Sequence, residues 1–473
     1  MFTPIYRLFV VVVVLFGLLV FATSWWTVFG ADPLRDNPAN RRALLEQARI
    51  KRGLIKAADG TVLARSVKRS DGTFTRRYPQ GELLSHAVGY SFIRFGQAGL
   101  ERSRNGPLTG ERDDITSIVD ELRGKRQEGD DVFTTLDTRA QRVAIDALGG
   151  QKGAVVALDP RSGAVKVMAS VPQYDPNKIP DIFGRLNKDP DAPLLNRTTQ
   201  GQYPPGSTFK VVTATAALDS GKFTPDSVLN GDSPKEISGA PLSNSGGSSF
   251  GDISLTTALT NSVNTVWAQV GQSVGQRTMA KYMERFGFYA RPPLDYPAGQ
   301  RYVSGVFTSR GLTPASSNQV DIGRVAIGQG GLLATPLQMA MVAAAVANGG
   351  TLVKPHLTDR IVDPDGRVSD DIGTTKYHRV MSGDTASKLT QMMANVVKEG
   401  TGTAAALSGI EVAGKTGTAE VENGATNQVW FIGFAPRADP KVAVAVTIER
   451  SDGQGGTVAA PIAKQVMETL LNQ

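Results

Sequence analysis

The sequence predicts an α+β chain in three parts: a single N-terminal transmembrane helix, a mixed α/β pedestal domain, and a larger domain with an antiparallel sheet flanked by helices plus a helical subdomain. Three observations support this division. An uncharged apolar run covers residues 8–29. The polar character of the region that follows changes at Gly153, where a β-hairpin pattern begins. Closely spaced apolar runs near the C-terminus are typical of strands in an antiparallel sheet.

The apolar run Leu8–Phe29 is long enough to cross a membrane, because 22 residues span about 33 Å as a helix. Trp25 and Trp26 suit the interfacial belt near its far end. A cleaved signal peptide would have a shorter apolar region and a cleavage site with small residues, which the bulky sequence from Ser24 lacks. We therefore expect an uncleaved, single-pass anchor in the cell membrane.

The chain after the anchor divides into two domains. Residues 30–150 are mixed and polar, with a charged helix expected at 35–52, short strands within 73–90 and a helix at 114–124. Residues 151–473 open with a hairpin of strands 154–158 and 164–169 and contain an apolar helix at 336–347. Strands are expected at 410–414, 429–435 and 442–448. The charges beside the anchor do not orient it, because the arginines after it outnumber Arg7 before it. Residues 1–7 are assigned to the cytoplasm and both domains to the outside, on the basis of the motifs described below, whose substrate would lie outside the cell.

Three short motifs in one order give the strongest functional signal: Ser207-Thr-Phe-Lys210, Ser262-Val-Asn264 and Lys415-Thr-Gly417. Together they are the parts of a serine-acylating site that uses lysine as its base. The first is the only Ser-x-x-Lys of the chain and the last is its only Lys-Thr-Gly. Their order and context make an accidental match improbable.

Ser207 is expected at the start of a helix, because Tyr203-Pro-Pro-Gly206 predicts a turn before it and the residues from Phe209 to Leu218 read as helical. Free N–H groups and the helix dipole favour negative charge there. Lys210, three residues on, lies on the same helix face and can reach the hydroxyl proton. The alternative for this motif taken alone is a serine cap beside a surface lysine.

Ser262 and Asn264 follow an apolar run with helical spacing that begins at Ile253. A second Ser-x-Asn match, Ser316-Ser-Asn318, lies in a sequence that reads as a loop before a helix. We assign the site to Ser262, and Ser316 to a cap. The Lys415 motif stands among the C-terminal strands, where Gly417 permits close approach of a substrate backbone.

The sequence offers few residues for other kinds of catalytic or binding site. It has three histidines, none beside a motif, and no cysteine, which excludes thiolate sites and disulfides. A Gly-x-Ser-x-Gly match around Ser249 follows a polar loop rather than the buried strand that a nucleophile elbow needs. No metal or cofactor signature is found. The net charge of +7 is small for 473 residues and does not indicate nucleic-acid binding.

The motifs resemble those of the class B penicillin-binding proteins, and further residues extend the resemblance over nearly the whole chain. The segments that carry it include Arg52-Gly-Leu-Ile, Gly99-Leu-Glu101, Thr135-Leu-Asp137, Ile327-Gly-Gln-Gly330 and Trp430-Phe431. The sequence is most similar to one actinobacterial group within the family, the penicillin-binding protein A group. The resemblance implies a penicillin-binding transpeptidase domain at 151–473 and a non-catalytic docking or dimerisation-type domain at 30–150.

The activity implied is that of a penicillin-sensitive D,D-transpeptidase, which cross-links peptidoglycan stem peptides in cell-wall synthesis for growth and division. The resemblance makes Ser207 the nucleophile and Lys210 its base, with Ser262 and Lys415 passing the proton to the departing D-Ala. Asn264, Thr416, Gly417 and Thr418 would bind the donor peptide. The backbone N–H groups of Ser207 and Thr418 would form the oxyanion hole.

The same resemblance implies the partners: stem peptides as substrates, β-lactams as covalent inhibitors, and a multispanning glycan polymerase with other proteins of division or elongation. No cofactor is implied. A charge argument supports the lysine base, because two ammonium groups about 4 Å apart repel by about 4 kcal/mol at an effective dielectric of 20. Lys415 near Lys210 would thus lower the pKa of Lys210, and partial burial would add to this effect.

Rival readings share the same acylation chemistry. A D,D-carboxypeptidase differs only in using water as the acceptor. A serine β-lactamase-like acylase would normally lack the anchor and the preceding domain and would need an efficient base for deacylation. A non-catalytic β-lactam receptor would need a cytoplasmic transmission module, and six residues precede Arg7. A bifunctional enzyme would need a glycosyltransferase domain, for which residues 30–150 are too few.

Overall fold

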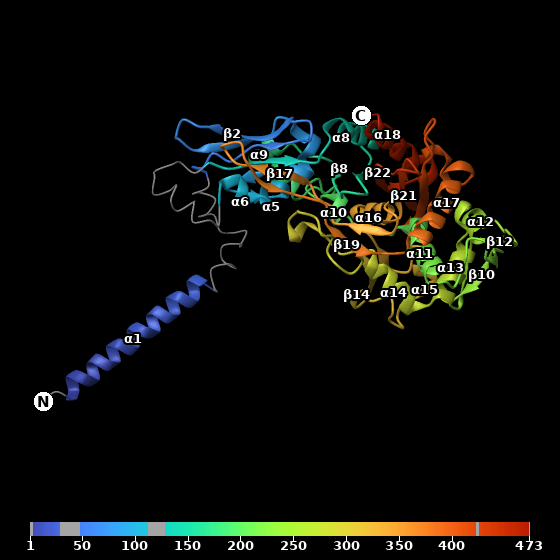
Figure 1. Ribbon diagram of the computed structural model, residues 1–473, viewed down its shortest axis with the longest axis horizontal. Helices are drawn as coiled ribbons and strands as arrows, with labels where there is room; N and C mark the ends of the chain where they lie inside the picture. Colours follow the sequence, from blue (N-terminus) through green and yellow to red (C-terminus); the bar gives the residue numbers. More distant parts are fainter. Residues whose placement is uncertain (1–2, 29–47, 112–127, 422–424, 473) are drawn as a thin grey trace.

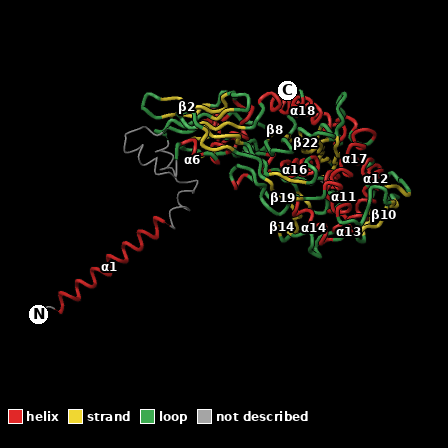
Figure 2. Tube along the Cα trace, in the orientation of Figure 1, coloured by secondary structure: helices red, strands yellow, loops and turns green. Residues whose placement is uncertain are grey.

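The computed structural model describes residues 3–28, 48–111, 128–421 and 425–472 (Figures 1 and 2). The first helix, α1 (Thr3–Val28), includes the predicted apolar run from Leu8, and in Figure 1 it extends away from the rest of the chain. Its segment Pro4–Trp26 is long and apolar enough to cross a membrane. The helices predicted at 35–52 and 114–124 fall mostly or wholly outside the described residues.

The N-terminal domain is built on a six-stranded sheet with the order β18-β17-β6-β1-β2-β3. Four strands come from this part of the sequence, and two come from residues more than 200 positions later. β17 pairs antiparallel with β6, so Ile361 lies opposite Val132. The strands are β1 (Ile55–Lys56), β2 (Val62–Lys68), β3 (Phe74–Arg77), β6 (Asp131–Thr134), β17 (Thr358–Val362) and β18 (Val368–Asp371).

Short elements surround this sheet. The strands expected within 73–90 reduce to β3, which is followed by η1 (Gly81–Leu84) and α4 (Ser85–Val88). The fully buried Glu101 receives bonds from the guanidinium groups of Arg52 and Arg76, so an ion-pair cluster holds the domain together. The remaining elements are β4 (Ser91–Phe92), β5 (Gly96–Gln97), α5 (Gly99–Ser103) and α6 (Asn105–Thr109).

The C-terminal domain is built on a five-stranded antiparallel sheet with the order β20-β21-β22-β7-β8. The hairpin predicted after Gly153 is confirmed. The C-terminal strands are confirmed with one difference: the motif Lys415–Gly417 lies inside the first of them rather than after it. The strands are β7 (Gly153–Leu158), β8 (Val165–Val171), β20 (Ala413–Val421), β21 (Thr426–Ala435) and β22 (Val442–Ser451).

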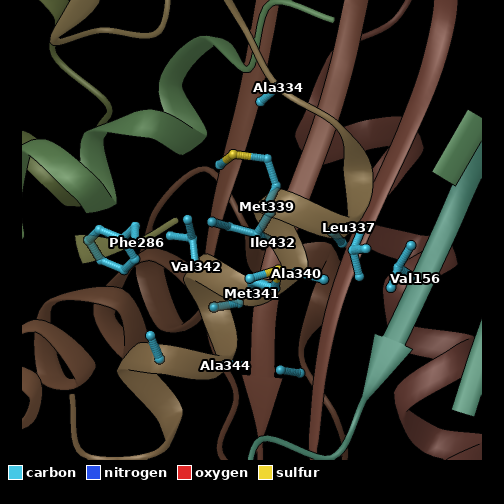
Figure 3. Close-up of a cluster of buried hydrophobic side chains, with 14 of the residues drawn as sticks. Val156, Phe286, Ala334, Leu337, Met339, Ala340, Met341, Val342, Ala344 and Ile432 are labelled. Carbon is cyan, nitrogen blue, oxygen red and sulfur yellow. The ribbon is translucent and has the colours of Figure 1, made fainter. Parts of the chain in front are cut away.

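Helices cover both faces of this sheet, because side chains of successive strand residues alternate between them. α16 (Pro336–Ala347), the predicted apolar helix, packs on one face, and Figure 3 shows its Leu337 and Ala340 near Ile432 and Val156. The other face is covered by α8 (Thr138–Leu148) and α18 (Ala460–Leu471). The helix α16 is apolar all round because it is buried between the sheet and the helical subdomain.

The helical subdomain packs beside edge strand β20. Its main helices are η3 (Gly206–Phe209), α11 (Lys210–Asp219), α12 (Leu255–Thr260), α13 (Asn264–Val274), α14 (Gln276–Arg285) and α17 (Gly383–Glu399). Smaller elements fill the loops: α9 (Ile179–Leu186), α10 (Arg197–Gln200), α15 (Ile322–Val325), β9 (Val228–Asn230), β10 (Lys235–Ile237), β11 (Ala240–Leu242), β12 (Asp252–Ser254), β13 (Gly305–Thr308), β14 (Gly311–Thr313), β15 (Leu332–Leu333), β16 (Thr351–Val353) and β19 (Lys376–Arg379). The three motifs meet at the boundary between sheet and helices.

Candidate active site

Ser207 lies in the first turn of the helix predicted for it, where η3 runs directly into α11. The preceding Gly206 has a φ of +52°, and a Cβ atom there would lie 2.9 Å from the backbone oxygen of Thr418. Only glycine avoids both the strain and the crowding. The tight turn therefore presses the start of the helix against strand β20 and brings Ser207 next to the Lys415 motif.

Lys210 is fully buried and its amine faces the second motif. The Nζ atom donates to the backbone oxygen of Ser262 at 2.6 Å, to Oδ1 of Asn264 at 2.7 Å and to Oγ of Ser262 at 3.3 Å. Among the described residues, no hydrogen bond involves the Ser207 hydroxyl. The hydroxyl of Ser207 is thus not engaged by a described residue, and it lies one helical turn before an amine that is held in place by oxygens.

Ser262 lies in a break between two helices, which differs from the uninterrupted helical run that the apolar spacing predicts. α12 ends at Thr260, and Ser262 adopts a φ of +59° before α13 begins at Asn264. Such a left-handed conformation is costly for a residue with a side chain and clusters at functional sites. The turn places the backbone oxygen and the hydroxyl of Ser262 on the same amine.

Lys415 reaches the same hydroxyl from the sheet. Its Nζ atom donates to Oγ of Ser262 at 2.9 Å and to the backbone oxygen of Thr416 at 3.0 Å, and its side chain is fully buried. Both lysines of the motifs therefore converge on one serine oxygen. The competing match at Ser316 lies outside this group, which supports the assignment to Ser262.

The other residues of the Lys415 motif differ in their exposure. Thr418 is partly exposed, and its hydroxyl accepts a bond from the N–H of Gly455 at 3.2 Å. Thr416 is buried, with its hydroxyl 2.6 Å from that of Thr401, a residue that sequence reasoning missed. A Cβ atom on Gly417 would lie 2.8 Å from the backbone oxygen of Pro205. The close approach at this glycine is to the protein's own chain.

Burial and charge both depress the basicity of the two amines. The pKa of Lys210 is held well below its usual range, first by burial and second by the charge of Lys415. Burial lowers the pKa of Lys415 to about 7. The predicted lowering of the Lys210 pKa is therefore confirmed. Burial is the larger cause, whereas the sequence predicts the charge of Lys415 to be the larger. This environment disfavours the protonated form of both amines.

We expect the buried Lys415 to make protein stability depend on pH. Its pKa is about 7 in the folded protein and 10.5 for an ordinary exposed lysine, as in the unfolded chain. Between these two pH values, the unfolded chain therefore binds more protons than the folded protein. Stability therefore rises with pH across that window, and the full penalty remains below it. Replacing Lys415 by methionine removes this contribution. The melting temperature of wild type minus that of Lys415→Met should increase from pH 7 to 10; a difference independent of pH would contradict the burial.

The segment before Ser207 is held by a second group of residues that sequence reasoning missed. The hydroxyl of Tyr203 donates to Glu449 on β22 at 2.5 Å, and Arg197, nearly buried, donates to the same carboxylate oxygen at 2.8 Å. The backbone of Tyr203 pairs with Ala334 through two bonds. The only sequence signal for this group was that Tyr203 lies four residues before Ser207. No local pattern indicates that Glu449 contacts this segment.

The indole nitrogen of Trp430 completes this support by donating to the backbone oxygen of Pro204 at 2.9 Å. The ring of Trp430 also lies edge-on to that of Tyr203. Each contact is to backbone or side chain within four residues of Ser207. Tyr203 and Glu449 therefore fix the position of the backbone that leads into Ser207.

Tyr203→Phe is expected to slow acylation by about tenfold, because loss of the bond to Glu449 loosens the segment before the nucleophile while every reacting group remains. The acylation rate constant should fall with little change in the dissociation constant of the first complex. Stopped-flow labelling with a fluorescent penicillin separates the two. The half-exposed Tyr302 supplies the control, Tyr302→Phe. Equal rates in wild type and Tyr203→Phe would contradict the positioning role.

The candidates set aside from the sequence lie elsewhere. Ser249 is exposed and its hydroxyl donates to Asp232 at 2.8 Å, with a short 3₁₀ turn rather than a strand before it. His86 is buried against the backbone oxygen of Pro172, and burial lowers its pKa to about 4. None of the contacts of His356 or His378 reaches the three motifs within the described part of the chain.

Comparisons with known proteins agree with this geometry. Residues 153–468 match the family described as the penicillin binding protein transpeptidase domain, and residues 52–132 match the penicillin binding protein A dimerisation domain. The chain is 34% identical to the peptidoglycan D,D-transpeptidase PbpA of Mycolicibacterium smegmatis, over 100% of this chain and 99% of that one. Identity to PbpA of Mycobacterium tuberculosis is 35%, over 98% of each.

Solved structures are similar over most of the chain. The penicillin G acyl-enzyme complex of penicillin-binding protein A from M. tuberculosis matches with a TM-score of 0.80 and 32% identity, covering 89% of this chain and all of that one. The D,D-transpeptidase domain of a peptidoglycan glycosyltransferase from Eggerthella lenta matches with a TM-score of 0.80 and 36% identity, covering 90% and 99%. Fold and sequence therefore point to the same group of proteins.

Proposed function

Because the chain belongs to the class B penicillin-binding proteins and is a penicillin-sensitive, serine-type peptidoglycan D,D-transpeptidase of cell-wall synthesis, we propose that Ser207 is its nucleophile and Lys210 its base. One observation carries the assignment of the residues. The amines of Lys210 and Lys415, from a helix and from a strand, meet on the hydroxyl of Ser262, and Lys210 follows Ser207 by three residues in one helical segment. This arrangement provides both a base for the nucleophile and a route for its proton.

The acylation step follows from these contacts. Oγ of Ser207 forms a bond to the carbonyl carbon of the penultimate D-Ala, while neutral Lys210 accepts the hydroxyl proton. The peptide bond to the terminal D-Ala then breaks. The departing nitrogen takes a proton from the Ser262 hydroxyl, which is replenished by the protonated amines of Lys210 and Lys415. An acceptor amine later attacks the ester and releases Ser207.

Substrate binding is assigned to residues on the two sides of the nucleophile. The amide of Asn264 holds the donor peptide, and the hydroxyls of Thr416 and Thr418 with the amine of Lys415 bind its terminal carboxylate. The partial exposure of Thr418 supports direct contact of its hydroxyl with the carboxylate. Thr416 is buried two residues earlier in the same strand, so its part in binding lies deeper in the site. The N–H of Ser207, in the first turn of its helix, has no intrahelical partner and with the N–H of Thr418 forms the oxyanion hole.

The experiment that separates a transpeptidase from a D,D-carboxypeptidase uses the full chain with a stem-peptide donor, with and without an amine acceptor. We expect the donor to be released mainly as a product joined to the acceptor, with only slow hydrolysis when the acceptor is absent. Mass spectrometry of the products distinguishes transfer from hydrolysis. Hydrolysis that is equally fast with and without acceptor would contradict the proposal.

We further propose that α1 anchors the protein in the cell membrane with both domains outside, and that residues 30–150 form a docking module. Its partner would be a multispanning glycan polymerase, with other proteins of division or elongation. The support is the helix long enough to cross a membrane and the position of this module between helix and transpeptidase domain. The division at 150–151 belongs to this proposal, with β17 and β18 crossing back into the N-terminal sheet.

The anchor is tested in cells with the full chain, because removing residues 30–150 would leave β17 and β18 without their partner β6. One form replaces α1 by a cleavable export signal, and another replaces it by an unrelated membrane helix. At matched abundance, we expect only the second form to restore cross-linking and growth. Full restoration by the exported soluble form would show that the anchor is dispensable.

A further inference from the structure

A cavity of about 300 Å³ lies in the N-terminal domain, between edge strand β3 and the turn that joins β4 to β5. Four arginines line it, Arg52, Arg69, Arg76 and Arg94, and none of the described residues that line it is acidic. Phenylalanine rings fill part of the remaining wall. The cavity therefore favours a negatively charged group carried on an apolar or extended body.

The positive charge at this cavity is only partly neutralised. Arg52 and Arg76 are both more than nine-tenths buried and share a single carboxylate, Glu101, at 2.9 and 2.6 Å. Two guanidinium groups against one carboxylate leave one buried positive charge. Nε of Arg52 and Nη2 of Arg76 have no hydrogen-bond partner among the described residues. Buried donors without acceptors are costly, so an incoming carboxylate would be stabilised here.

The backbone beside the cavity favours a polypeptide over a small anion. The bond from N–H of Arg69 to the oxygen of Thr73 fixes the alternation of the β2–β3 ladder, so Phe74 and Arg76 point their backbone groups away from β2. The N–H of Phe74 is already bonded to the oxygen of Ala48. The N–H and oxygen of Arg76 face the same way and make no backbone hydrogen bond to another described residue, so an extended chain can pair there.

The opposite edge of the same sheet carries the complementary charge. The hairpin that ends in β18, residues 358–371, holds five acidic and two basic residues, a net charge of −3. The β2–β3 hairpin, residues 62–77, holds five basic and one acidic, a net charge of +4. Asp365, Asp370 and Asp371 are exposed, and no ion pair joins them to another described residue. One molecule therefore presents a basic receptor edge and an acidic edge that fits it.

We propose that the β17–β18 hairpin of one copy of this chain docks in the arginine cavity of a second copy. Charged edge strands commonly prevent sheets from pairing, and like edges here would repel. That role alone does not account for the buried guanidinium donors or for opposite signs on the two edges. Since the two surfaces differ, the contact is head-to-tail and can extend into rows. Such rows would bring several active sites side by side on one membrane.

Cysteine cross-linking tests the contact, because the chain contains no cysteine of its own. Ile93→Cys places a thiol at the cavity and Val368→Cys places one on β18, and both sites are partly exposed and uncharged. The two full-length variants are mixed in liposomes and oxidised. We expect a disulfide dimer of one with the other, at least about tenfold more abundant than with either variant alone. The matched control pairs Val368→Cys with the exposed Val228→Cys on β9.

Charge reversal tests the recognition independently. Arg69→Asp with Arg94→Asp removes the receptor, and Asp370→Lys with Asp371→Lys removes the acidic edge. In sedimentation of the full chain in detergent, wild type should form concentration-dependent and salt-sensitive oligomers, and each variant alone should be monomeric. The two variants mixed together should form a dimer, because one keeps the receptor and the other keeps the acidic edge. Acylation by a fluorescent penicillin, unchanged in every variant, shows that the fold is intact.

Several results would overturn the proposal: a monomeric wild type at all concentrations, association that survives either charge reversal, or cross-linking equal to that of the Val228 control. A monomeric wild type would mean that the occupant of the cavity is an acidic segment of another protein. The second would place the contact between copies on a different surface. Neither result bears on Ser207 or on the transpeptidase reaction, so this proposal and the proposed function fail separately.

Discussion

Replacing Lys210 by alanine is expected to slow acylation of Ser207 by about 100- to 10,000-fold, the usual cost of losing a general base. The buried amine is the group of the helix that can take the hydroxyl proton, and burial holds its pKa well below the usual range, which favours the neutral form. Labelling with a fluorescent penicillin measures the rate, and thermal unfolding confirms that the variant is folded.

A second variant, Lys210→Arg, separates a base from a fixed positive charge. The guanidinium keeps the charge and remains protonated in proteins, so it cannot accept a proton. If Lys210 is the base, arginine should lose acylation nearly as completely as alanine. Retention of acylation within a few-fold of wild type in Lys210→Arg would show that the charge, and not proton transfer, is what the reaction needs.

Replacing Ser262 by alanine is expected to slow acylation by penicillin about 100- to 1,000-fold, for a different reason. Both amines donate to this hydroxyl, so it is placed to carry a proton to the departing nitrogen. Lys210 would keep its bonds to the backbone oxygen of residue 262 and to Asn264. The base would remain in position while the route to the leaving group is cut.

The leaving group provides the discriminating measurement for Ser262. A thiolate departs without being protonated, whereas an amide or β-lactam nitrogen does not. The acylation rate of Ser262→Ala should therefore fall much less with a thioester donor than with penicillin. The acylation rate of Lys210→Ala should fall with both substrates. Equal losses of Ser262→Ala on the two substrates would contradict a role in protonation and would leave Ser262 as a structural partner of the lysines.

Much of the candidate site could be predicted from the sequence, because its three motifs are short and local. Ser207 and Lys210 share one helical turn, so their spacing places them together. The α+β class, the apolar helix α16 and the hairpin after Gly153 also follow from periodicity and are confirmed. The acylating chemistry could be predicted for the same reason, because it depends on particular residue types at fixed spacing.

The remaining features depend on contacts that local patterns do not encode. The helical spacing around Ser262 hides the left-handed turn that brings its hydroxyl to Lys210 and Lys415. Nothing near Glu449 indicates that it holds Tyr203 from the far strand. The pairing of β17 with β6 joins residues more than 200 positions apart. Strand partners are set by tertiary packing, so a single sequence could not assign these residues.

The central claim is that Ser207 is the residue that becomes acylated. Full-length protein treated with penicillin, then analysed by intact mass and peptide mapping, tests it most directly. We predict a single adduct on the peptide that contains Ser207, and no adduct in Ser207→Ala. An adduct on another serine, such as the exposed Ser249, or undiminished labelling of Ser207→Ala, would contradict the account.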